Sequence, residues 1–152
     1  MRQPRLFLDT SALFAAVWSA QGGARALVRL GELRLVSLVV SSQVLTELDR
    51  TVNSKASQVI ADVAVILNEA RLSVVDPAPS ALVTYCESLT GYANDAHVLA
   101  AAWHAHVDYF VTLDRKHFLS NESLIQESPF PIGTPGDCLE WLKTKLAPDQ
   151  RN

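Results

Sequence analysis

The chain has 152 residues, of which 49% are hydrophobic and 19% are charged, and its formal net charge is −3 at pH 7. These values exclude general disorder and a broadly basic nucleic-acid-binding surface, and no apolar run reaches the ~18 residues that a membrane-spanning helix needs. Cys86 and Cys138 are too few for a disulfide framework and too far apart for a C-x-x-C metal site. We therefore expect reduced thiols, a cytoplasmic location and no membrane association. We also expect one domain over residues 1–147 and a frayed tail at 148–152.

Residues 5–11 contain the first structural signal. Three apolar residues run unbroken into Asp9, which is followed by Thr10 and Ser11. Such a run predicts a central parallel strand that is buried on both faces and ends in a carboxylate. Ligands of open α/β sheets bind beyond the carboxyl ends of the strands, so Asp9 is a candidate for chemistry. The alternative is that Asp9 only caps the following helix.

The remaining chain alternates between helical and extended patterns. Turn residues and prolines separate these segments. The alternation predicts a three-layer α/β/α fold with a central parallel sheet. In chain order, the expected elements are a strand at 5–8, helices at 12–19 and 24–31, a strand at 33–36, helices at 44–52 and 59–70, a strand at 72–76, helices at 80–89 and 94–103, a β-rich run at 108–114, an edge strand at 131–134 and a helix at 137–146.

Two acids lie on the predicted helices. Ser42 is the expected N-cap of the third helix, and Glu47 lies at the edge of its apolar face, where a carboxylate either points into a cleft or lies in solvent. Asn94 is the expected N-cap of a later helix, which places Asp95 in its first turn. Compensation of the helix dipole is sufficient to explain an acid there.

A fourth acid ends the β-rich run at 108–114. This run closes with Thr112 and the carboxylate of Asp114, before the basic pair Arg115 and Lys116. An Asp in such a turn also bonds to its own backbone. Four acids thus collect at predicted element ends. Because clustered carboxylates repel one another unless a cation neutralises them, we predict an oxygen-ligated Mg²⁺ or Mn²⁺.

Residues 7–13, 95–102 and 110–118 together closely resemble a PIN domain, and the resemblance covers nearly the whole chain. Glu47 falls where the family's second acid is expected. The resemblance implies metal-site acids at Asp9, Glu47, Asp95 and Asp114, and hydroxyl groups near the metal at Thr112 and Ser11. It also implies hydrolysis of RNA phosphodiester bonds by a metal-activated water.

Within this family the chain resembles the VapC-like toxins of bacterial toxin-antitoxin pairs, which implies an antitoxin partner and a homodimer. The helices at 42–70 would offer the antitoxin a groove, unless their apolar residues, among them Val59, all lie in the core. Arg115 and Lys116 are expected to guide the RNA backbone, although a charged turn is also commonly solvated. One departure is Lys116, because many PIN sequences carry a further acid there. A PIN module that binds nucleic acid or protein with little nuclease activity therefore stays open.

Overall fold

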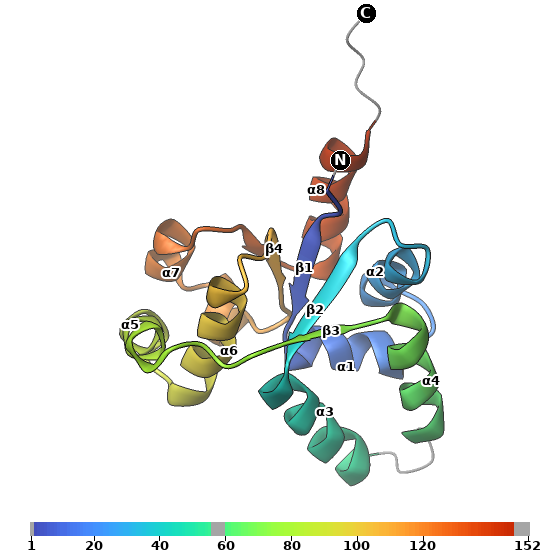
Figure 1. The fold of residues 1–152 in the computed structure, drawn as a ribbon, viewed down its shortest axis with the longest axis horizontal. Coiled ribbons are helices and arrows are strands. Elements are labelled where there is room, and N and C mark those ends of the chain that lie inside the picture. Colours follow the sequence, from blue (N-terminus) through green and yellow to red (C-terminus); the bar gives the residue numbers. More distant parts are fainter. Residues whose placement is uncertain (1, 56–59, 148–152) are drawn as a thin grey trace, which may run out of the picture.

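The computed structural model describes residues 2–55 and 60–147, and at its centre lies a five-stranded sheet (Figure 1). The order across the sheet is β3-β2-β1-β4-β5, and every neighbouring pair is parallel. The strands are β1 (Arg5–Leu8), β2 (Ser37–Ser41), β3 (Ser73–Val75), β4 (Tyr109–Val111) and β5 (Ile132–Gly133).

Helices cover both faces of this sheet. On one side lie α5 (Ser80–Thr90), α6 (Ala93–His104) and α7 (Glu122–Glu127) (Figure 1). On the other side lie α1 (Thr10–Trp18), α2 (Gly23–Glu32) and α4 (Ile60–Ala70). Two further helices are α3 (Ser42–Lys55), which directly follows β2, and α8 (Pro135–Leu146), which packs against α2. The arrangement confirms the predicted three-layer α/β/α fold.

An aromatic cluster lies in the core where β1 pairs with β4. Phe7 of β1 and Phe110 of β4 are fully buried and stack with their ring centroids 5.3 Å apart. Phe118 adds a third ring, 5.0 Å from that of Phe110. Full burial of one such side chain stabilises the fold by about 1.5–3 kcal/mol. This packing holds the carboxyl ends of β1 and β4 side by side, with Leu8 opposite Val111.

The strand order reverses at β1, because the chain continues to β2 and β3 on one side and then crosses to β4 and β5 on the other. A crevice forms outside the carboxyl ends of the strands at such a point. The backbone N–H of Asp9 donates to Val111 O (3.1 Å), and that of Thr112 donates to Gly133 O (2.9 Å). These hydrogen bonds place the residues that follow β1 and β4 at one crevice.

The strand predicted at 33–36 is wrong. This segment is a turn in which Arg34 has the left-handed backbone angle φ 61°, and β2 begins only at Ser37. Alternating side chains suggested a strand here, but Leu33 and Leu35 are exposed. The real strand is the buried run that begins four residues after Leu33.

Two predicted helix caps are also corrected. The side chain that caps α3 belongs to Ser41 and not to Ser42, because Ser41 Oγ accepts from the N–H of Val44 at 3.2 Å. Helix α6 begins at Ala93 with Tyr92 as its N-cap, so Asn94 lies inside the first turn.

Other helix ends follow expectation or were not anticipated. Helix α5 ends at Thr90 and is capped by Gly91, whose φ of 78° suits a residue without a side chain. Helix α7 was not predicted, because its six residues are too few to show a helical period. Val59 and the tail at 148–152 lie outside the described residues.

Candidate active site

Asp9 joins β1 to α1 and is 6% exposed. Its Oδ1 accepts hydrogen bonds from the backbone N–H of Ala12 (3.0 Å) and from Ser11 Oγ (2.7 Å). Its Oδ2 accepts from Thr112 Oγ1 at 2.5 Å. Asp9 therefore does cap α1, and at the same time it presents a nearly buried carboxylate at the crevice.

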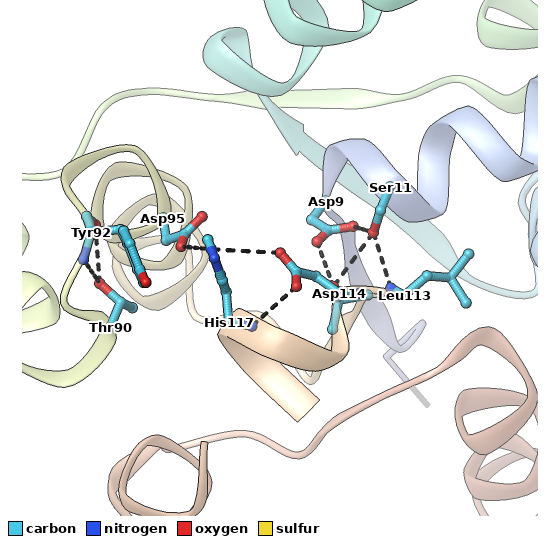
Figure 2. Close-up of polar contacts among 9 residues, drawn as sticks. Asp9, Ser11, Thr90, Tyr92, Asp95, Leu113, Asp114 and His117 are labelled. Atoms are coloured by element: carbon cyan, nitrogen blue, oxygen red, sulfur yellow. Dashed lines mark hydrogen bonds and ion pairs between the residues drawn. The ribbon is translucent and has the colours of Figure 1, made fainter. Parts of the chain in front are cut away.

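Two hydroxyl groups fix the orientation of Asp9. Thr112 Oγ1 accepts from the backbone N–H of Asp114 at 3.0 Å. Ser11 Oγ accepts from the backbone N–H of Leu113, also at 3.0 Å (Figure 2). Because each hydroxyl accepts a backbone hydrogen bond, its own proton is free to point at Asp9. The backbone after β4 thus holds the carboxylate through two hydroxyl bridges.

Glu47 reaches the same crevice from α3. Its Oε2 accepts from Thr10 Oγ1 at 2.6 Å, and its Oε1 accepts from Gln43 Nε2 at 3.1 Å. The Gln43 amide also donates to the backbone oxygen of Asn94, at the start of α6 (3.3 Å). Of the two expected orientations for Glu47, the structure therefore shows the one that points into a cleft.

Asp95 and Asp114 face each other across a histidine. A π-helical turn, η2 (Arg115–Leu119), follows Asp114, whose Oδ1 accepts from the backbone N–H of His117 at 3.0 Å. The His117 ring then turns toward α6, where its Nδ1 lies 2.6 Å from Asp95 Oδ2 and 3.8 Å from Asp114 Oδ2 (Figure 2). Asp114 thus bonds to its own backbone, as one interpretation expected, and also contributes to the acidic cluster.

One cavity of about 190 Å³ collects all four predicted acids. A wider hollow of about 530 Å³ adjoins it, shares Glu47, Asp95 and Asp114 with it, and adds the side chain of Arg50. The smaller cavity is lined by Asp9, Thr10, Ser11, Glu47, Asp95, Val98, Asp114 and Phe118.

Burial and neighbouring charges shift the pKa values of two acids in this cavity. Burial raises the pKa of Asp9, the charge of Asp114 adds to the rise, and the hydrogen bonds from Ser11, Thr112 and Ala12 oppose it. Burial also raises the pKa of Asp95, where the charges of Asp114 and Glu47 add and His117 opposes. Both carboxyl groups thus hold their protons more tightly than in water, chiefly because burial disfavours their charged forms.

The donor chemistry of the cavity suits a hard divalent cation. Asp95, Asp114 and His117 each offer one donor atom, and these atoms lie within 4.8 Å of one another. Asp9 and Glu47 add carboxylate oxygens on the walls of the same cavity. Carboxylates with room for water are the usual surroundings of Mg²⁺ and Mn²⁺.

Not every predicted residue reaches the cavity. Arg115 and Lys116 are exposed on the π-helical turn and line neither hollow, as far as the described residues define them. Sequence reasoning missed His117, Thr10 and Arg50. His117 lies three residues after Asp114, a spacing that returns a side chain to the same face in a helical turn, but the segment was interpreted as a basic loop.

A family model described as a PIN domain matches residues 5–116, which is most of the chain. The chain belongs to the PIN domain family. A chain of the VapBC2 crystal structure from Rickettsia felis, bound to a promoter DNA fragment, superimposes with a TM-score of 0.64 at 15% identity and covers 84% of this PIN protein and 96% of the other chain. The structure of PAE2754 from Pyrobaculum aerophilum gives a TM-score of 0.62 at 16% identity, and the match covers 95% of this PIN protein and 96% of the other chain. At these identities the likeness concerns the fold. A comparison with curated proteins finds no match.

Helices long and apolar enough to cross a bilayer do not occur in the described ranges of this PIN protein.

Proposed function

We propose that this PIN protein is a Mg²⁺- or Mn²⁺-dependent endoribonuclease and the toxin of a toxin-antitoxin pair. The observation that carries the nuclease proposal is the convergence of Asp9, Glu47, Asp95 and Asp114 on one cavity at the point where the strand order reverses. Membership of the PIN family adds support.

In this proposal the four carboxylates hold the cation, and Thr112 and Ser11 orient Asp9 toward it. A bound divalent cation supplies a water of lowered pKa and stabilises negative charge on the scissile phosphate. Thr10 keeps Glu47 turned inward through its 2.6 Å hydrogen bond. The cavity walls bury Asp9 almost completely, which strengthens its attraction to a cation relative to that of an exposed carboxylate.

The wider hollow offers the RNA a path to the acids. Arg50 lines it beside Glu47, so its guanidinium is placed to pair with a phosphate next to the scissile one. Arg115 and Lys116 are exposed on the π-helical turn directly after Asp114 and would contact the RNA backbone further along. These three cations provide local attraction on a chain whose net charge is −3.

The decisive experiment is a cleavage assay on single-stranded RNA with the purified protein. Cleavage is expected with Mg²⁺ or Mn²⁺, and EDTA should stop it. Asp9→Asn and Asp95→Asn should each be inactive, because each removes a negative charge from the cavity. His104→Asn, an exposed change in the last turn of α6, is the matched control and should cleave like wild type. Undiminished cleavage by either Asp variant would refute the proposed site.

Fold similarity to a chain of a VapBC2 structure supports the toxin proposal, as does an apolar hollow between α3 and α4. That hollow has a volume of about 240 Å³. An amphipathic antitoxin helix fits such a groove. The lining residues are Leu45, Leu48, Asp49, Val52, Val63, Ala64 and Leu67.

A groove variant tests the partner separately from the chemistry. Leu67→Glu should prevent copurification with the product of the neighbouring gene but leave RNA cleavage intact, whereas Val65→Glu, outside the lining, should bind normally. Expression of the protein alone should arrest growth, and normal growth would argue against a toxin. Light scattering should give a dimer, and a monomer would reject the proposed homodimer. Fractionation should place the protein in the cytoplasm.

Lys116 favours one alternative, a PIN module that binds RNA or protein without cutting it. The resemblance leads us to expect an acid at this position, and the structure has an exposed lysine there. RNA retained by the protein in Mn²⁺ but never cleaved would support this alternative over the nuclease.

A further inference from the structure

His117 lies between two of the proposed metal ligands but was not among the predicted site residues. Its side chain is 26% exposed, and its Nδ1 is 2.6 Å from Asp95 Oδ2. Its backbone N–H donates to Asp114 Oδ1 at 3.0 Å. The π-helical turn after Asp114 thus places one residue in contact with both acids. Such turns frequently occur at functional sites.

The spacing between His117 and Asp95 matches a hydrogen bond. Two neighbouring ligands of an octahedral Mg²⁺ at 2.0–2.1 Å from the ion lie about 2.9 Å apart. The Nδ1–Oδ2 separation of 2.6 Å is shorter than this, and it is the distance of a strong hydrogen bond to a carboxylate. With Oδ2 engaged by the imidazole, Asp95 Oδ1 remains available for a cation.

An aromatic partner holds the histidine ring in this position. Tyr92 stacks on His117 with the ring centroids 4.2 Å apart and the planes only 3° from parallel. Tyr92 is itself held by Thr90, whose Oγ1 accepts from the Tyr92 N–H (3.3 Å) and donates to the Tyr92 backbone oxygen (3.1 Å). Figure 2 shows Thr90 and Tyr92 on one side of Asp95 and His117, and Asp114 on the other side.

We propose that His117 is a positioning residue: its Nδ1–H donates to Asp95 Oδ2, and the Tyr92 ring holds the imidazole so that Asp95 presents Oδ1 to the cation. This inference rests on the proposed metal site and adds to it residues that hold a ligand without touching the metal. Groups of this kind are worth about 10–100-fold in metal affinity in other metalloproteins. The Tyr92–His117 pair therefore sets how tightly the site binds its cation.

A matched pair of variants separates the donor from the ring. His117→Phe keeps an aromatic ring to stack on Tyr92 but removes the hydrogen-bond donor. His117→Asn removes the ring but keeps an N–H donor the same number of bonds from Cα as Nδ1. Tyr92→Phe keeps the stack and Tyr92→Ala removes it. His104→Asn is the surface control.

The readout is Mn²⁺ binding to the full-length protein by titration calorimetry, with circular dichroism to verify that each variant is folded. His117→Phe should weaken Mn²⁺ binding by about 10-fold or more, the usual effect of removing such a group. Tyr92→Phe and His104→Asn should stay within a few fold of wild type, and His117→Asn and Tyr92→Ala, which each keep the donor and lose the stack, should fall between wild type and His117→Phe. Equal affinity of His117→Phe and wild type would overturn the inference.

A spectroscopic measurement on wild type covers the case in which the variants do not fold. Electron spin echo spectroscopy of bound Mn²⁺ should show no directly coordinated nitrogen, because His117 contacts Asp95 and not the metal. A directly bound imidazole nitrogen would overturn the inference and make His117 a ligand. If wild type binds no Mn²⁺ at all, the proposed function fails. If wild type binds Mn²⁺ and cleaves RNA, a negative result for His117 rejects the positioning role alone.

Discussion

Thr112 Oγ1 donates a 2.5 Å hydrogen bond to Asp9 Oδ2, although 103 residues separate the two along the chain. The same Oγ1 accepts from the backbone N–H of Asp114 at 3.0 Å. One fully buried hydroxyl therefore links the acid after β1 to the acid after β4. We therefore expect both the stability of the fold and the proposed chemistry to depend on this hydroxyl.

Replacement of this hydroxyl by a methyl group should affect both properties. Thr112→Val leaves a buried carboxylate and a backbone N–H each short of one partner, which should lower the free energy of unfolding by about 1–3 kcal/mol. RNA cleavage should fall as well, because Asp9 is no longer held in its orientation. Urea denaturation and the cleavage rate measure the two effects. Thr112→Ser keeps the hydroxyl and is the control, so equal losses in Val and Ser would contradict the prediction.

The raised pKa of Asp9 makes a pH-dependent prediction. The Asp9 carboxyl group holds its proton more tightly in the native state than in the unfolded state. At pH values between its ordinary pKa of 3.8 and its raised native pKa, the native state therefore binds more protons than the unfolded state does. Stability from this group is therefore complete below the ordinary value and decreases as pH rises through that window. Asp9→Asn removes the effect and retains a favourable N-cap residue. In EDTA the variant should melt close to wild type near pH 4 and increasingly above it at higher pH.

Melting curves of both proteins across pH 4–8 test this sign. A variant that melts below wild type at every pH would show that the hydrogen bonds of Asp9 outweigh its burial. A difference that does not change with pH would show that the Asp9 charge is not its cause.

Cation binding should stabilise the native state. Mn²⁺ at 100 times its dissociation constant should add about 2.7 kcal/mol to the unfolding free energy of wild type. In a domain of this length each kcal/mol corresponds to roughly 2–4 °C in melting temperature. Asp9→Asn and Asp95→Asn should shift less, because each has one negative charge fewer in the cavity. Absence of any shift in wild type would mean that the acids do not form a metal site.

Arg115 and Lys116 should act on RNA and not on the metal. Their alanine variants should weaken RNA binding and lower the slope of log affinity against log salt by about 0.7 for each RNA phosphate that the protein no longer neutralises. Mn²⁺ affinity should not change, because neither side chain lines the acid cavity in the described part of the chain. Filter binding at several salt concentrations measures the slope. Lys143→Ala, an exposed lysine paired with Glu140 on α8, is the control, and an equal decrease there would indicate general electrostatics.

Much of the fold follows from the sequence because apolar runs have few alternatives. Phe7 and Phe110 lie in short runs without charge, and such runs become buried strands in the middle of a sheet. Parallel strands bring their carboxyl ends to one edge, so the placement of Asp9 and Asp114 near that edge could be predicted. The turn at Gly91 was predictable for a similar local reason, since glycine readily adopts a left-handed backbone.

Local sequence patterns gave wrong predictions where a turn or a helix start has residues that also suit another structure. Leu33 and Leu35 alternate like strand residues, yet Arg34 turns the chain and leaves both leucines exposed. At the start of α6 the favoured capping residue Asn94 lies one residue inside the helix, because the helix begins directly after Tyr92.

The sequence by itself determined that Asp9 and Asp114 follow strands and so lie near the carboxyl edge of the sheet, whereas the tertiary structure alone decided which side chains touch there. Glu47 contacts Thr10, 37 residues away in the chain, because α3 packs beside α1. The hydrophobic periodicity of the sequence does not predict this contact. His117 meets Asp95 across 22 residues because a single π-helical turn redirects its side chain. Residue type and spacing specify local backbone geometry. Contacts between side chains of separate elements depend on how those elements pack, and here that packing makes four scattered acids and one histidine a single site.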